Sequence, residues 1–231
     1  MSSNYGGPWT QEKLACVQRY MHAYAKVMKD QPFTVDYVDA FAGSGDFSPP
    51  ASTSPASDAL FDTFETESRD AAEFRAGSAR LALETEPAFD NYLFIEERAK
   101  NVRQLELLCT DYPDRMNKCR VVRGDANEIL AEYCMRSWSG RRALVFLDPF
   151  GTEVRWATLQ TLGATRAVDL WYLFPLSGVL RMARNDGSIP EDWSARLDSV
   201  PGTAEWGGEV DRAASQTSRF EEAPTRGAAA G

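Results

Sequence analysis

The sequence of 231 residues contains a single histidine, His22, and only four cysteines. With one histidine, neither a histidine-based metal site nor a Ser-His-Asp triad is expected. The cysteines are scattered and have no C-x-x-C spacing, so they are expected to be reduced and to behave as small hydrophobic residues. They are Cys16, Cys109, Cys119 and Cys134. No metal site is predicted.

Long apolar runs are also missing. No stretch reaches the roughly 18 consecutive apolar residues of a membrane span, and residues 1–7 lack the basic and apolar regions of a signal peptide. With 43% apolar and 26% charged residues, the composition predicts a globular, cytoplasmic protein without a membrane partner. The length favours one domain. We expect a single α/β domain over residues 1–215 and a disordered, Ala- and Gly-rich tail over 216–231.

The net charge of −9 is unevenly distributed, because residues 98–142 carry ten basic and six acidic side chains. The overall acidity argues against strong non-specific binding to nucleic acid. Two interpretations of the basic segment stay open. It forms either a local basic face or the more usual solvated surface of mixed charge. The first would be built from Arg98, Arg103, Arg120, Arg123, Arg141 and Arg142.

The stretch 33–45 carries the most information. Its β-branched and aromatic residues predict a short buried strand that ends near Val38. Asp39 follows, and Gly43 and Gly45 then allow a tight turn and a close approach of the backbone to a ligand. The pattern departs from the dinucleotide fingerprint, because Ser48 stands where a third glycine would be. An ordinary tight turn is the alternative.

Strands and helices alternate along the rest of the chain. Further strands are predicted over 92–96, 120–123, 143–147 and 168–174. A first helix is predicted to have its N-cap at Thr10 and to end near Lys29, and further helices are predicted over 78–84, 101–110, 128–138 and 156–162. Nearly all-apolar strands that alternate with helices predict a mostly parallel sheet with helices on both faces, seven-stranded or somewhat truncated. Residues 46–90 are expected to form an insertion or lid, because they are first rich in Pro and Ser and then acidic.

Four of the predicted strands run into an acid: Asp39, Glu96, Asp125 and Asp148. In a parallel sheet these acids share one edge, where such sheets bind ligands. Unpaired carboxylates are costly to bury, so this edge should face water or a ligand rich in hydrogen-bond donors. S-adenosylmethionine is such a ligand. We expect Asp39 and the glycine turn beside its amino-acid end, Glu96 at the ribose hydroxyls and Asp125 near the adenine. A solvated cap at each strand end is the alternative.

The spacing of Asp39, Phe41, Gly43 and Gly45 resembles the first motif of S-adenosylmethionine-dependent methyltransferases. Further motifs make the chain similar, over roughly Trp9 to Trp206, to the bacterial three-Cys-motif partner (TcmP) family. They are Lys13-Leu14, Asp39–Gly45, Phe94–Glu96, Gly124–Asn127 and Leu147–Gly151. The resemblance implies a Rossmann-like class I methyltransferase fold. It also implies a partner, a three-Cys-motif protein that resembles radical S-adenosylmethionine enzymes.

Asp148-Pro149-Phe150-Gly151 resembles the Asp/Asn-Pro-Pro-Tyr/Phe motif of methyltransferases that modify amino groups of bases. By that resemblance, Asp148 and the Pro149 carbonyl accept from the target amino group and Phe150 stacks on the base. The second proline is missing here, which leaves open a different amine acceptor or a simple β-turn. Two functions are therefore expected. One is methylation of an amino nitrogen, with a nucleic-acid base as one acceptor. The other is that of a non-catalytic or substrate-presenting partner.

Overall fold

The computed structural model describes residues 8–45, 77–149 and 153–174. Within these ranges five strands form one sheet in the order β3-β2-β1-β4-β5, and every neighbouring pair is parallel. This arrangement confirms the predicted α/β class with a parallel sheet, and its topology is Rossmann-like. The strands are β1 (Thr34–Asp39), β2 (Asn91–Glu96), β3 (Cys119–Arg123), β4 (Arg141–Leu147) and β5 (Val168–Tyr172).

The helices follow the predicted order, and several of their ends differ from the prediction by a few residues. α5 stops at Cys134 and not at Trp138, because the Trp138 indole turns back and donates to the Cys134 carbonyl (3.1 Å), which satisfies one of the last helical acceptors. A single-turn helix that opens on Pro113 was not predicted. The helices are α1 (Pro8–Met28), α3 (Ala99–Thr110), α4 (Pro113–Met116), α5 (Ala126–Cys134) and α6 (Trp156–Ala164), with a further helical segment over 77–84.

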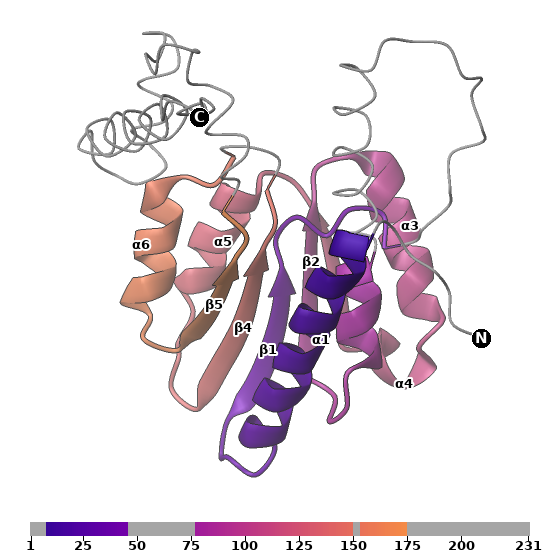
Figure 1. Cartoon of the computed structure of the whole chain (residues 1–231). Coiled ribbons are helices and arrows are strands. Elements are labelled where there is room, and N and C mark those ends of the chain that lie inside the picture. The colour runs from indigo at the N-terminus through magenta and orange to yellow at the C-terminus, as the bar shows by residue number, and fades with distance from the viewer. Residues whose placement is uncertain (1–7, 46–76, 150–152, 175–231) are drawn as a thin grey trace, which may run out of the picture. The chain divides into compact units, whose positions relative to one another are not determined.

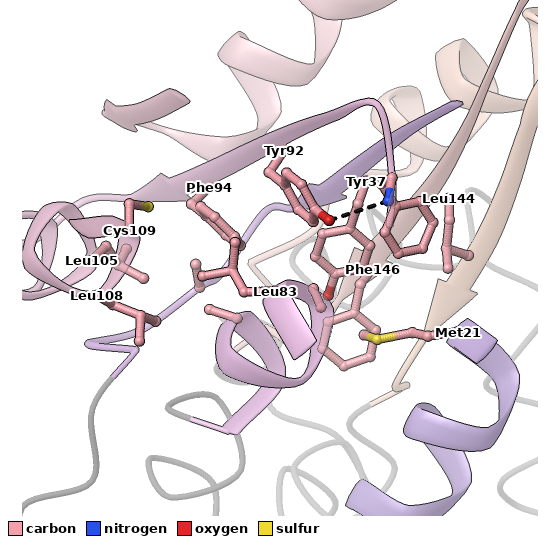
Figure 2. Close-up of a cluster of buried hydrophobic side chains, with 14 of the residues drawn as sticks. Met21, Tyr37, Leu83, Tyr92, Phe94, Leu105, Leu108, Cys109, Leu144 and Phe146 are labelled. Atoms are coloured by element: carbon pink, nitrogen blue, oxygen red, sulfur yellow. Dashed lines mark hydrogen bonds between the residues drawn. The ribbon is translucent and has the colours of Figure 1, made fainter. Parts of the chain in front are cut away.

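The main core lies on one face of the sheet, under α1, the helical segment 77–84 and α3. Tyr37 is level with Tyr92 on β2 and Leu144 on β4, so the three side chains project from the same face. The Tyr37 ring packs 5.4 Å from Phe89 and 6.3 Å from Phe94, between ring centroids. Figure 2 shows the Tyr37, Tyr92 and Phe94 rings. The Phe89 amide donates to the Tyr92 hydroxyl (3.1 Å). The buried aromatic layer fixes which side of each strand faces inward.

The opposite face is covered by α5, whose Tyr133 hydroxyl donates to Asp36 of β1 (2.9 Å). Figure 1 shows α1 on one side of the sheet and α5 on the other. The prediction of helices on both faces is thereby confirmed.

The segment before β2 is part of the core. Ala79, Ala82 and Leu83 are fully buried in the cluster that also contains Tyr37. The end of the predicted insertion at 46–90 therefore packs as an ordinary helix of the fold. Residues 46–76 and the tail predicted over 216–231 lie outside the described residues.

The chain divides into two compact units. The first comprises residues 1–148 and 160–173 and contains the whole sheet; the second comprises 149–159 and 174–231. The second unit contributes only residues 149, 153–159 and 174 to the part of the chain that is described. The single domain predicted over 1–215 therefore includes part of the second unit, most of which lies outside the described residues.

The raised pKa values of the tyrosines predict that the folded protein loses stability at alkaline pH. Every tyrosine of the described ranges has a raised pKa, first of all because burial disfavours the phenolate. Folding thus favours the neutral phenol, so this contribution to stability is complete below pH 10 and is lost as the pH rises through about 12. The pKa is raised to about 12 for Tyr20, Tyr24, Tyr92 and Tyr112, and is also raised for Tyr37, Tyr133 and Tyr172.

We expect phenolate absorbance to appear late in the folded protein. At pH 10 the protein in urea should have about half of its tyrosines ionised, whereas the folded protein should show much less. The folded signal should then rise between pH 10 and about 12, together with the loss of circular dichroism. Superimposable titration curves in buffer and in urea would contradict the prediction.

Candidate functional site

The four predicted acids share the carboxyl edge of the sheet. Asp39 is level with Phe94 on β2 and Phe146 on β4. Glu96 and Asp148 therefore lie two positions further along the neighbouring strands, and Asp125 follows the end of β3. β2 and β3 extend from one side of β1, and β4 and β5 from the other, so the topological switch point lies between β1 and β4. Open α/β sheets bind their ligands at such a point.

Three of these acids have the same local role. Each accepts a hydrogen bond from the backbone N–H two residues further on, as in Asx-type turns. Asp39 accepts from Phe41 (3.2 Å), Glu96 from Arg98 (2.8 Å) and Asp125 from Asn127 (2.6 Å). An acid at the end of these strands thus has a structural cause, because it closes the turn that leads into the next segment.

Asp39 is the most enclosed of the four. Its side chain is fully buried, and its second carboxylate oxygen accepts from the Ser78 hydroxyl at 2.7 Å. The Tyr37 hydroxyl lies near this carboxylate without reaching hydrogen-bond geometry, and its pKa is raised by burial and then by the Asp39 charge. Asp39 therefore stabilises the turn through hydrogen bonds from other groups of the protein. Its contact with a cofactor stays a prediction.

The glycine turn has the predicted conformation. Gly43 and Gly45 have φ values of 63° and 66°, which lie in the left-handed region that glycine enters readily. A Cβ on Gly45 would stand 2.7 Å from Leu108 and 2.8 Å from Leu105. A side chain at this position would therefore need Leu105 and Leu108 of α3 to shift, and the positive φ disfavours one as well. At Gly43, the positive φ value is the structural reason for a glycine.

Glu96 is the acid whose carboxylate is best placed for a ligand. Its side chain is half-buried. Among the described residues, only its Oε1 accepts a hydrogen bond, which the Arg98 amide donates. The other oxygen has no protein donor there, and a carboxylate offers about four acceptor sites. Asp125, by contrast, is the N-cap of α5 and accepts from both nitrogens of Asn127. A ligand that donates hydrogen bonds thus finds an open acceptor at Glu96, whereas Asp39 and Asp125 each accept more than one hydrogen bond from the protein.

The predicted catalytic turn is described only at its start. Asp148 is half-buried and follows β4 at the carboxyl edge. Pro149 is the first residue of the second compact unit, and Phe150 lies outside the described residues.

The strongest polar network among the described residues lies elsewhere, at the amino edge of the sheet. Asp36 is 2% exposed and accepts from Tyr133 (2.9 Å), Arg136 (2.9 Å) and Arg141 (3.1 Å). It also accepts from the Asn91 side chain at 2.8 Å. Sequence reasoning did not single out Asp36. The sequence feature that could have identified it is an acid inside an otherwise apolar strand, because a buried carboxylate must have hydrogen-bonding partners.

The six arginines considered as a local basic face do not form one. Arg141 and Arg142 are neighbours on β4, so their side chains alternate, and Arg142 lies over the Phe33 ring at 3.9 Å. Arg120 shares a cleft with Arg141, whereas Arg123 is at the carboxyl end of β3. The interpretation of these six arginines as a single basic face is therefore wrong. Their charges are distributed over both faces and both edges of the sheet.

No protein-family model matches the sequence, and no curated protein matches it either. Within the described ranges, no helix has the length and apolar character needed to cross a membrane. The same ranges contain no cluster of His, Cys, Asp and Glu side chains that could hold a metal ion. The described cysteines are free thiols.

Proposed function

We propose that this chain is an S-adenosylmethionine-dependent methyltransferase that acts on an amino nitrogen, with an amino group of a nucleic-acid base as the first acceptor to test. The observation that carries the proposal is the edge at the switch point. There the Gly43–Gly45 turn, Glu96 with one oxygen that accepts from no described residue, and the carboxylate of Asp148 lie at the ends of three adjacent strands. S-adenosylmethionine would supply an electrophilic methyl group.

The residues have separate tasks in this proposal. Glu96 accepts from the ribose hydroxyls through the oxygen that the Arg98 amide leaves available. Gly43, with its positive φ, lets the backbone approach the cofactor. Asp148 accepts a hydrogen bond from the acceptor amine and orients its nitrogen. Catalysis is mainly proximity and orientation, which can contribute about 7–11 kcal/mol to lowering a barrier.

Binding of S-adenosylmethionine tests the cofactor site. Glu96→Gln should weaken the affinity about tenfold, because one charge-assisted hydrogen bond is worth about 1.5–3 kcal/mol. Glu97→Gln is the matched control, since Glu97 is the exposed neighbour and its carboxylate makes no hydrogen bond within the described residues. Isothermal titration with S-adenosylmethionine and S-adenosylhomocysteine measures both. Equal affinities for wild type and both variants would place the ligand elsewhere, and an absence of binding would contradict the proposal.

A second candidate is a non-catalytic partner of a three-Cys-motif, radical-S-adenosylmethionine-like protein. The observation that favours it is that Asp39, Glu96 and Asp125 each already serve a local turn. Such a protein would keep the fold, with or without the cofactor, and would act through its companion protein. It would transfer no labelled methyl group from S-adenosylmethionine to any acceptor.

A further inference from the structure

A second site lies at the amino edge of the sheet, opposite the edge of the proposed function. A cleft of about 320 Å³ is lined by residues at the starts of β2, β3 and β4, by Asp36 of β1 and by the end of α5. This volume is within the range of clefts that take small ligands. The cleft belongs wholly to the first compact unit.

The charge of the cleft is unbalanced. Its lining includes four cationic side chains, Lys118, Arg120, Arg136 and Arg141, against one carboxylate, Asp36. This concentration of positive charge occurs in a protein whose net charge is −9. Clefts that are lined by one sign of charge concentrate ligands of the opposite sign.

Two of the cationic side chains are held in place by Asp36 and have further hydrogen-bond donors available. Arg136 and Arg141 each use one terminal nitrogen, Nη1, to reach Asp36, and each side chain is 33% exposed. The Arg136 guanidinium also lies over the Tyr133 ring at 3.7 Å. Their other guanidinium N–H groups donate to no group within the described residues. Asp36 thus orients two planar forks whose remaining donors are unused among the residues that the structure describes, and this preorganisation suits a ligand with several oxygens.

The remaining two cations complete the site. The side chains of Lys118 and Arg120 make no hydrogen bond or ion pair within the described ranges, and Arg120 is exposed. They come from the segment that enters β3 and from β3 itself, whereas Arg136 and Arg141 come from the α5–β4 side. Cations therefore approach the cleft from two separate parts of the chain.

We propose that this cleft binds a phosphate group. Arginine forks match the oxygens of phosphate in bidentate geometry, and the negative charge of a phosphate offsets part of the lining's surplus of positive charge. The phosphate belongs either to a free nucleotide or to the backbone of a nucleic acid, which share this chemistry. The site is separate from the methyltransferase edge, so it stands or fails independently of the proposed function.

The test compares two charge-matched double variants. Lys118→Gln with Arg120→Gln removes two cations from the cleft. Lys100→Gln with Arg103→Gln removes two exposed cations from α3, outside the cleft. Isothermal titration at low salt uses inorganic pyrophosphate, thymidine 5′-monophosphate and a short oligothymidylate. Thymidine, which lacks phosphate, and succinate, a dicarboxylate, serve as ligand controls.

We expect wild type and the α3 double variant to bind pyrophosphate alike, and the cleft double variant to lose about tenfold or more in affinity. Binding of the monophosphate identifies a free nucleotide as the source, and binding of the oligonucleotide with little binding of the monophosphate identifies a nucleic-acid backbone. Equal losses in both double variants would overturn the proposal. So would thymidine or succinate binding as tightly as the phosphates, or wild type binding none of the phosphate probes.

Discussion

Asp36→Ala should lower the free energy of unfolding by about 3–4 kcal/mol. The substitution removes one carboxylate that accepts hydrogen bonds from four side chains. Removing one partner of a buried ion pair costs about 3–5 kcal/mol, and we take the lower part of that range because Arg136 and Arg141 are each 33% exposed. Tyr133 is 5% exposed, so its hydroxyl would be left buried without its acceptor. Urea unfolding followed by circular dichroism measures the change.

Two variants separate this network from a general loss of charge. Asp36→Asn keeps the shape and one acceptor oxygen, so it should cost less, about 1–2 kcal/mol. Glu132→Ala removes an exposed carboxylate from α5, the helix that carries Tyr133, and should change stability by about 0.5 kcal/mol or less. If Asp36→Ala were as mild as Glu132→Ala, the hydrogen bonds at Asp36 would contribute little to the fold.

The sheet could be predicted because its signal is local. β1, β2 and β4 have six or seven residues each, are mainly apolar, and end in an acid or are followed by one, a pattern that predicts buried parallel strands. The ends of the helices were less predictable. α5 is terminated by the Trp138 indole, a local side-chain contact that the periodicity of apolar residues does not reveal. The four-residue helix at Pro113 is too short to show any periodicity.

The two edges of the sheet differ in how much the sequence reveals. Three acids at the carboxyl edge, Asp39, Glu96 and Asp125, each accept from the amide two residues further on, so their placement follows from the strand ends alone. The Asp36 network joins residues that are 55 to 105 positions apart. Ser78, the partner of Asp39, is 39 positions away and precedes the next strand. Only the folded sheet brings these groups together, so spacing in the sequence could not identify them.

If the proposed function is right, Asp148→Ala should reduce methyl transfer about a hundredfold or more while S-adenosylmethionine affinity stays within about twofold. Removing one preorganised hydrogen-bonding group from a reacting centre costs about 10²–10³ in turnover. Affinity for the cofactor should survive, because the proposal assigns cofactor contacts to Glu96 and the Gly43–Gly45 turn. Asp148→Asn should retain part of the activity, since its side-chain carbonyl can still accept from an amine.

The measurement is transfer of labelled methyl groups to DNA, RNA and cell extract, with titration of S-adenosylmethionine on the same samples. Asp30→Ala, which removes an exposed carboxylate after α1, is the control and should behave as wild type. Equal label with wild type and Asp148→Ala would remove Asp148 from the mechanism and leave the cofactor site standing. Loss of cofactor binding in Asp148→Ala would assign Asp148 to the cofactor and not to the amine. The assay therefore distinguishes a residue that orients the acceptor from one that only helps to hold the methyl donor.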